Sequence, residues 1–388
     1  MKVLITDPIS DEGIKLLKSE PGLQVDVETK LTKEQLLEKI KDYDALIIRS
    51  ETQVTKEVID AAQHLKIIGR AGVGIDNVDV PVATAKGIIV ANAPEGNTIA
   101  ACEHTIAMML AMSRNIPQAN ASLKTGKWER SKFMGVEVLG KTLGVVGMGR
   151  IGGEVTKRAR CMGMEVLAYD PFTTPERARE IGAKLTSVEE IYEKSDYITV
   201  HTPLTPGTKH MISTPQFAKM KKGVRIINCA RGGIIDEAAL LEAVKSGKVA
   251  IAALDVFEKE PPVGSPLLEQ PNVIVTPHLG ASTKEAQISV AVIIAEQVLN
   301  AFRGMPVTTA LNIPIMKAET MEQIKPFLPL AENLGRFTAQ MVEGHNQQMD
   351  EPGPIICRRH VFPPCGQPFN IPGDWRASAS LAASPCGR

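Results

Sequence analysis

Short apolar runs alternate along the chain with stretches that carry the three-to-four-residue spacing of amphipathic helices. The apolar runs are rich in Val, Ile and Leu, which favours buried strands. In the first part of the chain they predict strands at 2–6, 24–28, 45–48, 67–69 and 88–91, with helices at about 11–18, 32–39, 56–62 and 80–86. Strands that alternate with helices are typical of a parallel sheet, so this part predicts a small α/β domain.

A second series of the same kind follows a long apolar helical stretch at 97–126. We interpret that stretch as a helix that packs between domains and between subunits, because it is too apolar for a surface linker. The second series predicts strands at 142–146, 165–169, 197–200, 224–228, 250–254 and 273–275. After Ser282 a helix to about Phe302 leads back toward the first domain.

These patterns predict an α/β fold with two Rossmann-like domains, each a doubly wound parallel sheet. The first domain is expected to be discontinuous, with residues 1–97 and 284–312, and the second to span 98–283. Residues 313–344 are expected to begin a further domain that is incomplete. From 345 to 388 Pro, Gly, Ser and Ala dominate and no helical or strand period remains, so we predict a disordered tail.

Composition narrows the class of protein. The 388 residues are 44% hydrophobic, enough for substantial cores, and Lys+Arg and Asp+Glu both total 44. A chain without net charge has no general attraction for nucleic acid or an anionic membrane. The N-terminus turns polar too early for a signal peptide, and we expect no apolar run near the roughly 20 residues that span a bilayer. Six cysteines without metal-ligand or disulfide spacing predict no metal site and a cytoplasmic protein.

A glycine motif predicts a dinucleotide site. Gly147, Gly149 and Gly152 follow the strand predicted at 142–146 and open a helix, and Asp170 ends the next strand. Glycines at this spacing allow a tight turn and close approach of a pyrophosphate to the helix N-terminus. An acidic residue in the place of Asp170 accepts the ribose hydroxyls and repels a 2′-phosphate, which favours NAD over NADP.

Arg231 lies just past the strand predicted at 224–228, beside two glycines that leave room for a ligand. Ligands of doubly wound sheets bind at the carboxyl ends of strands, and a guanidinium matches a carboxylate with two hydrogen bonds. A surface salt bridge is the structural alternative for this arginine. We predict that Arg231 binds a substrate carboxylate.

Glu260 and His278 lie between Pro-rich turns, where each alone would be an ordinary exposed loop residue. If they pair, the carboxylate fixes the imidazole tautomer and favours its protonated form, so that His278 can exchange a proton with a substrate hydroxyl. Cys229 has no visible base or motif for a nucleophile. We interpret it as a small residue that packs near the nicotinamide.

Four segments together resemble the D-isomer-specific 2-hydroxyacid dehydrogenases. They lie at 147–152, 228–233, 254–261 and 277–283, and read GMGRIG, NCARGG, LDVFEKEP and PHLGAST. Segments 69–79, 92–97 and 126–133 resemble the members of that family that act on 3-phospho-D-glycerate. The resemblance extends over roughly residues 1–344. Longer members add an intervening domain and a serine-binding domain, which are not recognisable here, so we do not expect serine inhibition.

The resemblance implies the following site. Arg231 would hold the substrate carboxylate, His278 would act as acid and base, and Glu260 would be its partner. The positions that would line the NAD site are Gly147, Gly149, Arg150, Ile151, Gly152, Asp170, Thr202, Cys229, Ala230, Asp255, His278, Gly280 and Ala281. Those that would bind the phosphorylated substrate are Arg49, Arg70, Gly72 and Asn97, with Arg130 and Lys132 reaching across a homodimer formed through the NAD-binding domain.

The resemblance also implies an activity: NAD-dependent oxidation of 3-phospho-D-glycerate to 3-phosphooxypyruvate, the first step of serine formation by the phosphorylated route. Residues 1–97 and 284–312 would then bind the substrate, and residues 98–283 would bind NAD. A glyoxylate or hydroxypyruvate reductase on the same scaffold is the nearest alternative. An NAD-sensing scaffold without enzymatic activity is an alternative of a different class.

Overall fold

The computed structural model describes residues 1–313 and 323–341. The described residues up to Pro326 form one compact unit that contains two parallel sheets, and those from Phe327 to Met341 belong to a second unit. In that second unit the structure describes helix α14 (Leu328–Met341), which follows the short 3-10 helix η4 (Lys325–Phe327). The tail predicted at 345–388 lies outside the described residues.

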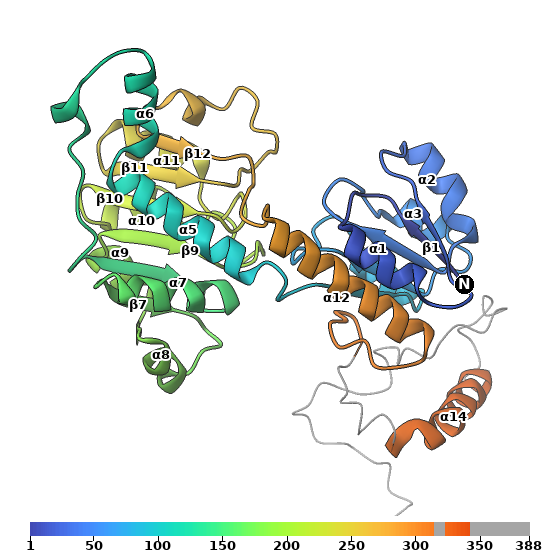
Figure 1. The fold of residues 1–388 in the computed structure, drawn as a ribbon. Helices are drawn as coiled ribbons and strands as arrows, with labels where there is room; N and C mark the ends of the chain where they lie inside the picture. Colours follow the sequence, from blue (N-terminus) through green and yellow to red (C-terminus); the bar gives the residue numbers. More distant parts are fainter. Residues whose placement is uncertain (314–322, 342–388) are drawn as a thin grey trace, which may run out of the picture. The chain divides into compact units, whose positions relative to one another are not determined.

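The first sheet has the strand order β2-β1-β3-β4-β5, all parallel. Its strands are β1 (Lys2–Ile5), β2 (Gln24–Val27), β3 (Ala45–Ile48), β4 (Ile67–Arg70) and β5 (Ile89–Asn92). The helices between them are α1 (Asp11–Lys18), α2 (Lys33–Lys39), η1 (Ile40–Asp42), α3 (Lys56–Ala61) and α4 (Val80–Ala85). Helices cover both faces of this sheet (Figure 1), so its central strands are continuous apolar runs rather than alternating ones.

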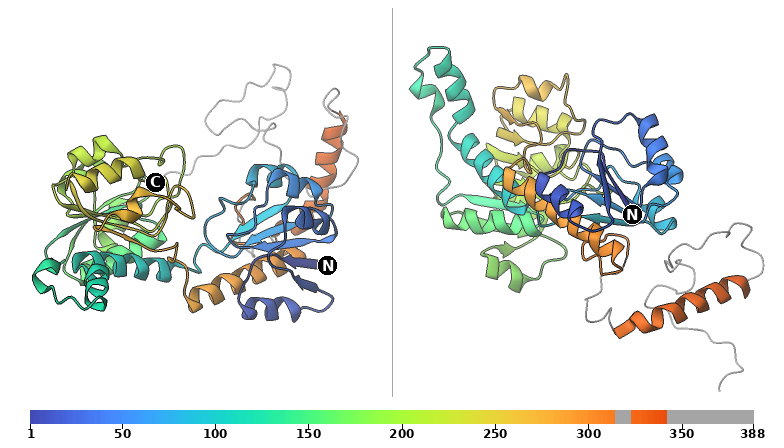
Figure 2. Two further views of the ribbon diagram at one scale, coloured as in Figure 1. Left: turned by 90° about the horizontal axis from the view of Figure 1, so that it is seen from above. Right: turned by 45° about the vertical axis from the view of Figure 1, so that its right-hand side comes forward.

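Helix α12 (Lys284–Phe302) returns to this first sheet and packs on α1 and β4. Figures 1 and 2 show it lying against α1 although the two are far apart in sequence. Val290, Ile294 and Val298 enter the same apolar cluster as Val3 and Ile47. The first sheet is therefore covered by a helix that lies far from its strands in the sequence.

One prediction about composition was wrong at this helix. Helix α12 has 19 residues and a mean hydropathy of 1.2, which is long and apolar enough to cross a membrane by length and composition. In this structure 44% of that window is buried, and Thr283 caps its N-terminus by accepting the Ala286 N–H at 3.1 Å. The apolar surface of α12 is thus explained by packing on the first sheet.

The second sheet has the order β12-β11-β10-β9-β6-β7-β8, also parallel. Its strands are β6 (Thr142–Val146), β7 (Glu165–Tyr169), β8 (Lys184–Leu185), β9 (Tyr197–Val200), β10 (Val224–Asn228), β11 (Val249–Leu254) and β12 (Val273–Val275). Its helices are α7 (Arg150–Cys161), α8 (Pro175–Ile181), α9 (Val188–Lys194), α10 (Thr214–Lys219), α11 (Glu237–Lys245) and η3 (Pro266–Glu269).

Strand order reverses between β6 and β9, and ligands of doubly wound sheets bind at such a point, beside the carboxyl ends of the strands. The two Rossmann-like sheets confirm the predicted fold class. The long helix predicted at 97–126 is two helices, α5 (Thr98–Ser113) and α6 (Ile116–Lys124), followed by η2 (Arg130–Phe133). They are separated at Asn115, whose φ of 53° is left-handed and ends the first helix.

Candidate functional site

The glycine motif forms the turn between β6 and α7. Gly147 has a φ of 94°, and a Cβ there would lie 2.7 Å from the His201 carbonyl carbon. A Cβ at Gly152 would lie 2.0 Å from the Gly147 oxygen. Both positions therefore require glycine, whereas a Cβ at Gly149 would meet nothing within 4 Å. The turn is tight on its protein side and open beside Gly149, the shape that a pyrophosphate at a helix N-terminus needs.

A groove of about 500 Å³ opens beside this turn. Gly149, Arg150 and Lys157 of α7 line it, together with Arg177 of α8. The Arg150 guanidinium is more than half exposed and lies 3.5 Å from Glu95 Oε1, a weak pairing that leaves it available to an anion. Ile151 instead packs into the apolar cluster beneath α7.

Asp170 lies at the end of β7 and holds the turn. Its Oδ2 accepts the Met148 N–H at 2.7 Å and its Oδ1 accepts the Phe172 N–H at 2.7 Å. Each carboxylate oxygen keeps a further lone pair. The side chain is only partly buried, so it can still accept ribose hydroxyls as the sequence predicts.

We expect Asp170→Ala to weaken NAD binding by about tenfold and to reduce the preference for NAD over NADP. The substitution removes an acceptor for the ribose hydroxyls and a charge that repels a 2′-phosphate. Fluorescence titrations with NADH and NADPH measure both effects. Glu176→Ala, at an exposed ion pair with Arg179 on the nearby α8, is the control, and an unchanged NADH/NADPH ratio in Asp170→Ala would remove Asp170 from this role.

Three predicted cofactor residues follow β9 and β10. Thr202 Oγ1 is buried and has no hydrogen-bond partner among the described residues, so it is ready to bond a ligand. Burial raises the pKa of the Cys229 thiol to about 12, which makes a nucleophilic role unfavourable. Ala230 N–H donates to Asn228 Oδ1 at 3.0 Å, which shapes the turn that carries Arg231.

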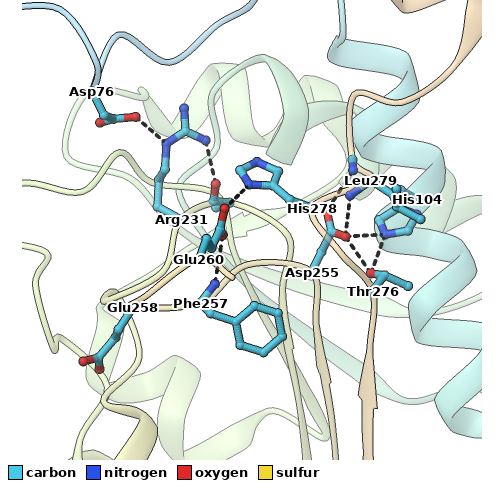
Figure 3. A network of polar contacts seen from close by, with 12 residues as sticks. Asp76, His104, Arg231, Asp255, Phe257, Glu258, Glu260, Thr276, His278 and Leu279 are labelled. Atoms are coloured by element: carbon cyan, nitrogen blue, oxygen red, sulfur yellow. Dashed lines mark hydrogen bonds and ion pairs between the residues drawn. The ribbon is translucent and has the colours of Figure 1, made fainter. Parts of the chain in front are cut away.

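Asp255 ends β11 and fixes the loop that carries His278 (Figure 3). Its carboxylate is fully buried and accepts the Leu279 N–H at 2.7 Å, the Gly280 N–H at 2.8 Å and the Thr276 hydroxyl at 2.6 Å. Burial raises the pKa of Asp255, but these hydrogen bonds and His104 outweigh burial and lower it overall. Asp255 is therefore ionised and anchors Gly280, next to Ala281, in place.

His104 of α5 is a member of this network that the sequence reasoning missed. Its Nε2 lies 3.2 Å from Asp255 Oδ1 and 3.1 Å from Thr276 Oγ1. A polar residue within the apolar helix α5 was the available signal. Its partners are more than 150 residues away in sequence, so no local pattern identifies them.

His278 and Glu260 meet as predicted by the pairing hypothesis. His278 Nδ1 lies 2.8 Å from Glu260 Oε2, and Glu260 Oε1 accepts the Phe257 N–H at 3.1 Å. His278 has a left-handed φ of 55°, and its N–H donates to the Asp255 carbonyl at 2.9 Å. With Nδ1 turned to the carboxylate, Nε2 remains for a substrate proton.

Burial raises the pKa of Glu260, but the hydrogen bonds from His278 and the Phe257 N–H reverse this effect and lower it overall. A carboxyl with a lowered pKa stays ionised as the solution becomes acidic, and its charge is lost only when the pH falls through that lowered value. Glu260 therefore remains a carboxylate over the range in which an imidazole titrates.

We expect Glu260→Gln to move the acid limb of the kcat/KM profile for hydroxy-acid oxidation to lower pH. His278 lowers the pKa of Glu260, so the two groups are coupled. Oxidation needs an imidazole that can accept a proton, and the loss of the adjacent negative charge disfavours the imidazolium. The alkaline limb in the reduction direction should move the same way. Glu242→Gln, exposed on α11, is the control; limbs that move in opposite directions would contradict the pairing.

Arg231 follows β10 and forms an ion pair, as the alternative interpretation of this residue as a salt-bridge arginine predicted. Its Nε donates to Asp76 Oδ2 at 3.1 Å and its Nη1 donates to the Ala230 carbonyl at 2.7 Å. The Asp76 side chain is 68% exposed and that of Arg231 29%, so solvent reaches the carboxylate and weakens the pair. A substrate carboxylate can therefore replace Asp76 at small cost.

A second arginine lies close to Arg231. A Cβ at Gly74 would lie 1.8 Å from Arg231 Nη2, and a Cβ at Gly72 would lie 1.8 Å from Arg70 Nη1, so both guanidinium groups lie against one glycine loop. Burial lowers the pKa of Arg70 to about 10, and the charges of Arg231 and Arg49 add to this effect. The buried Arg70 Nε has no hydrogen-bond partner among the described residues. The three arginines thus form a cationic cluster, whose charge Asp76 and Asp7 offset in part.

The remaining predicted substrate residues differ in setting. Asn97, at the start of α5, has a buried Oδ1 without a partner in the described part of the chain. Arg130 and Lys132 are exposed in η2. Lys132 pairs locally with Glu129 at 3.5 Å and lies 5.9 Å from the Phe133 ring. No contact of these two cations with the arginine cluster is present in the described residues, so their predicted role depends on a partner subunit.

The sequence matches a known protein family and several characterised relatives. Residues 106–280 match the family model for the D-isomer specific 2-hydroxyacid dehydrogenase, NAD binding domain. A D-3-phosphoglycerate dehydrogenase from Archaeoglobus fulgidus is 53% identical over 345 residues, which cover 89% of this chain and 65% of that protein. The chain belongs to the D-isomer specific 2-hydroxyacid dehydrogenase family. It spans slightly less than two thirds of the length of that archaeal relative.

Solved structures of the same family agree with the fold. A glyoxylate reductase from Paecilomyes thermophila has a TM-score of 0.74 and 31% identity, over 80% of this chain and 98% of that chain. A D-lactate dehydrogenase from Aquifex aeolicus, solved with NAD and lactic acid, has a TM-score of 0.71 and 28% identity, over 81% of this chain and 100% of that chain.

Proposed function

We propose that the chain catalyses NAD-dependent oxidation of 3-phospho-D-glycerate to 3-phosphooxypyruvate, the first step of serine formation by the phosphorylated route. The observation that carries this proposal is the cationic cluster of Arg49, Arg70 and Arg231 near the His278–Glu260 pair. A substrate with a carboxylate and a phosphate supplies anionic groups that such a cluster binds. Identity of about half to phosphoglycerate dehydrogenases supports it.

The residues of the NAD turn fit a dinucleotide. Gly149 leaves open space beside the N-terminus of α7, and Asp170 and Thr202 offer polar groups at the ends of β7 and β9. When bound, NAD supplies the acceptor for a hydride. We propose residues 98–283 as the NAD-binding domain and residues 1–97 with 284–312 as the substrate-binding domain.

The chain's own residues then have distinct roles. Arg231 exchanges Asp76 for the substrate carboxylate and orients C2. His278 Nε2 takes the hydroxyl proton as the C2 hydride leaves with its electron pair and the carbonyl forms. Glu260 stabilises the resulting imidazolium, and Asp255 holds the His278 backbone. In the reverse direction His278 returns the proton to the carbonyl oxygen.

Arg70→Ala is expected to separate substrates. With 3-phospho-D-glycerate we expect kcat/KM to fall by about 10–100-fold, because a charge-assisted contact to the phosphate is lost, and with D-glycerate by about threefold or less. Steady-state NADH formation with both substrates measures this difference. Arg303→Ala, at the exposed pair with Glu20, is the control.

Equal losses with both substrates would mean that Arg70 only shapes the loop. A wild-type enzyme that prefers glyoxylate or hydroxypyruvate would favour the reductase alternative, and NADH binding without turnover of any hydroxy acid would favour an NAD-sensing scaffold.

We also infer a cytoplasmic homodimer through the segment that follows α5. It exposes large apolar side chains that a monomer would leave in water: Ile116, Leu123, Trp128, Met134 and Leu139. Arg130 and Lys132 lie on the same segment, so a dimer through it would carry these cations toward the partner. Light scattering of the purified chain measures the assembly.

A further inference from the structure

A second histidine–glutamate pair joins His210, between β9 and α10, to the loop that carries Glu260. His210 Nε2 lies 3.0 Å from Glu258 Oε1, two residues before Glu260. Figure 3 shows Glu258 pointing away from the Glu260–His278 pair. His210 has a φ of 51° and His278 a φ of 55°, a left-handed conformation unfavourable for residues other than glycine. In both histidines this backbone brings the imidazole to a carboxylate of the same loop.

Glu258 also joins this loop to the start of α11. The Glu258 N–H donates to Glu237 Oε1 at 2.6 Å, and the Glu237 N–H donates to Glu258 Oε1 at 3.2 Å. The contact is reciprocal and uses one of the α11 N–H groups that lack an intrahelical partner. Glu258 Oε1 contacts both the Glu237 N–H and His210 Nε2. One carboxylate thus connects the start of α11 with the segment of His210.

The same contacts reach the turn after Arg231. The His210 N–H donates to the Gly233 carbonyl at 2.8 Å. A Cβ at Gly232 would lie 1.8 Å from the Phe257 carbonyl oxygen, so the turn and the loop are in direct contact and only glycine fits. His210 and Glu258 therefore connect the turn that carries Arg231 with the loop that carries Glu260.

Charge explains why a histidine is placed here. Burial raises the pKa of Glu237, and the negative charges of Glu258 and Glu260 act in the same direction, while the Glu258 N–H and His210 oppose them. Hydrogen bonds from the Ala239 N–H and the Ser213 hydroxyl lower the pKa of Asp236, the N-cap of α11, and His210 acts in the same direction. His210 thus lies among carboxylates that repel one another and reduces that repulsion.

We propose that His210, Glu237 and Glu258 form a positioning clasp that holds the 257–260 loop where Glu260 meets His278 and keeps Arg231 in register with that pair. None of the three touches the reacting atoms. The kinetic consequence rests on the proposed function. The structural consequence, an intact Glu260–His278 hydrogen bond, does not.

The test compares Glu258→Ala with Glu258→Gln and His210→Asn. Glutamine keeps the acceptor oxygen for the Glu237 N–H, and asparagine tolerates the left-handed backbone at 210 while it removes the imidazole. His64→Asn, an exposed histidine after α3, is the control. The first readout is the ¹⁵N NMR signal of His278 Nδ1 in protein labelled at histidine, without substrate, with Glu260→Gln as the reference for a changed pair.

We expect Glu258→Ala and His210→Asn to move the His278 signal toward that of Glu260→Gln, and Glu258→Gln to restore it. We expect kcat for hydroxy-acid oxidation to fall by about 10–100-fold in Glu258→Ala, as for a small misplacement of reacting groups, with NADH affinity unchanged and recovery in Glu258→Gln to within about threefold.

An unchanged His278 signal in Glu258→Ala and His210→Asn would overturn the clasp, as would a kcat loss that Glu258→Gln does not recover. If Glu258→Ala does not fold, Glu237→Gln provides the same comparison, because it weakens the reciprocal contact while keeping the shape. A wild-type chain without turnover would contradict the proposed function and leave the NMR comparison as the test of the clasp.

Discussion

Replacement of His278 by asparagine is expected to lower kcat/KM for 3-phospho-D-glycerate oxidation by about 10²–10⁴-fold, the usual contribution of a positioned acid–base group. Asparagine is the appropriate substitute because it tolerates the left-handed backbone at 278. The variant should therefore retain the contacts of the His278 N–H to the Asp255 and Thr276 carbonyls. NADH affinity, measured by fluorescence, should stay within about twofold of wild type.

The matched control is His64→Asn, which removes an exposed imidazole and should leave turnover unchanged. Turnover of His278→Asn near the wild-type value would exclude His278 as the proton acceptor. A parallel loss of NADH affinity and turnover would instead assign His278 to the cofactor site, because weaker cofactor binding would then explain the lower turnover.

Arg231→Lys is expected to reduce transition-state stabilisation by about 2–4 kcal/mol. Lysine keeps the positive charge but loses the planar fork that holds a carboxylate with two hydrogen bonds. It also loses the Nη1 contact to the Ala230 carbonyl, at 2.7 Å, which aims the guanidinium. The kcat/KM of the variant, converted to a free-energy difference, measures the effect.

Arg303→Lys, at an exposed ion pair in the first sheet's domain, should cost nothing measurable. Asp76→Asn gives a second comparison, because it removes the present partner of Arg231 and should leave the substrate carboxylate without a competitor. Near-wild-type turnover in Arg231→Lys would contradict the carboxylate role and would mean that Arg231 serves only to pair with Asp76.

Much of the fold follows from local pattern. Runs such as Ala45–Ile48 and Tyr197–Val200 are fully buried because helices cover both faces of their sheets, and their bounds were predicted as observed. The division of the 97–126 stretch was not predicted, although Asn115 takes a left-handed backbone there and Pro117 stands in the first turn of α6, a position where proline marks a helix start. Strand β8 has two residues, too few for a periodic signal.

The candidate site, too, was predicted only in part from the sequence. Gly147, Asp170, Arg231 and His278 were predicted because each lies at a strand end or in a turn with its own local pattern. His104, His210 and Glu237 were missed because each acts through a partner that folding brings from a distant segment. Tertiary contacts of this kind leave no period in the sequence.

Deuterium labelling tests most directly whether a hydride passes from C2 of the substrate to NAD. The purified chain is incubated with NAD and 3-phospho-D-glycerate that carries deuterium at C2, and the nucleotide product is analysed by mass spectrometry, with D-glycerate in a parallel reaction. We predict NADH that contains one deuterium, formed with a higher kcat/KM from the phosphorylated substrate. Absence of label in the NADH, or more efficient turnover of D-glycerate, would contradict the proposed function.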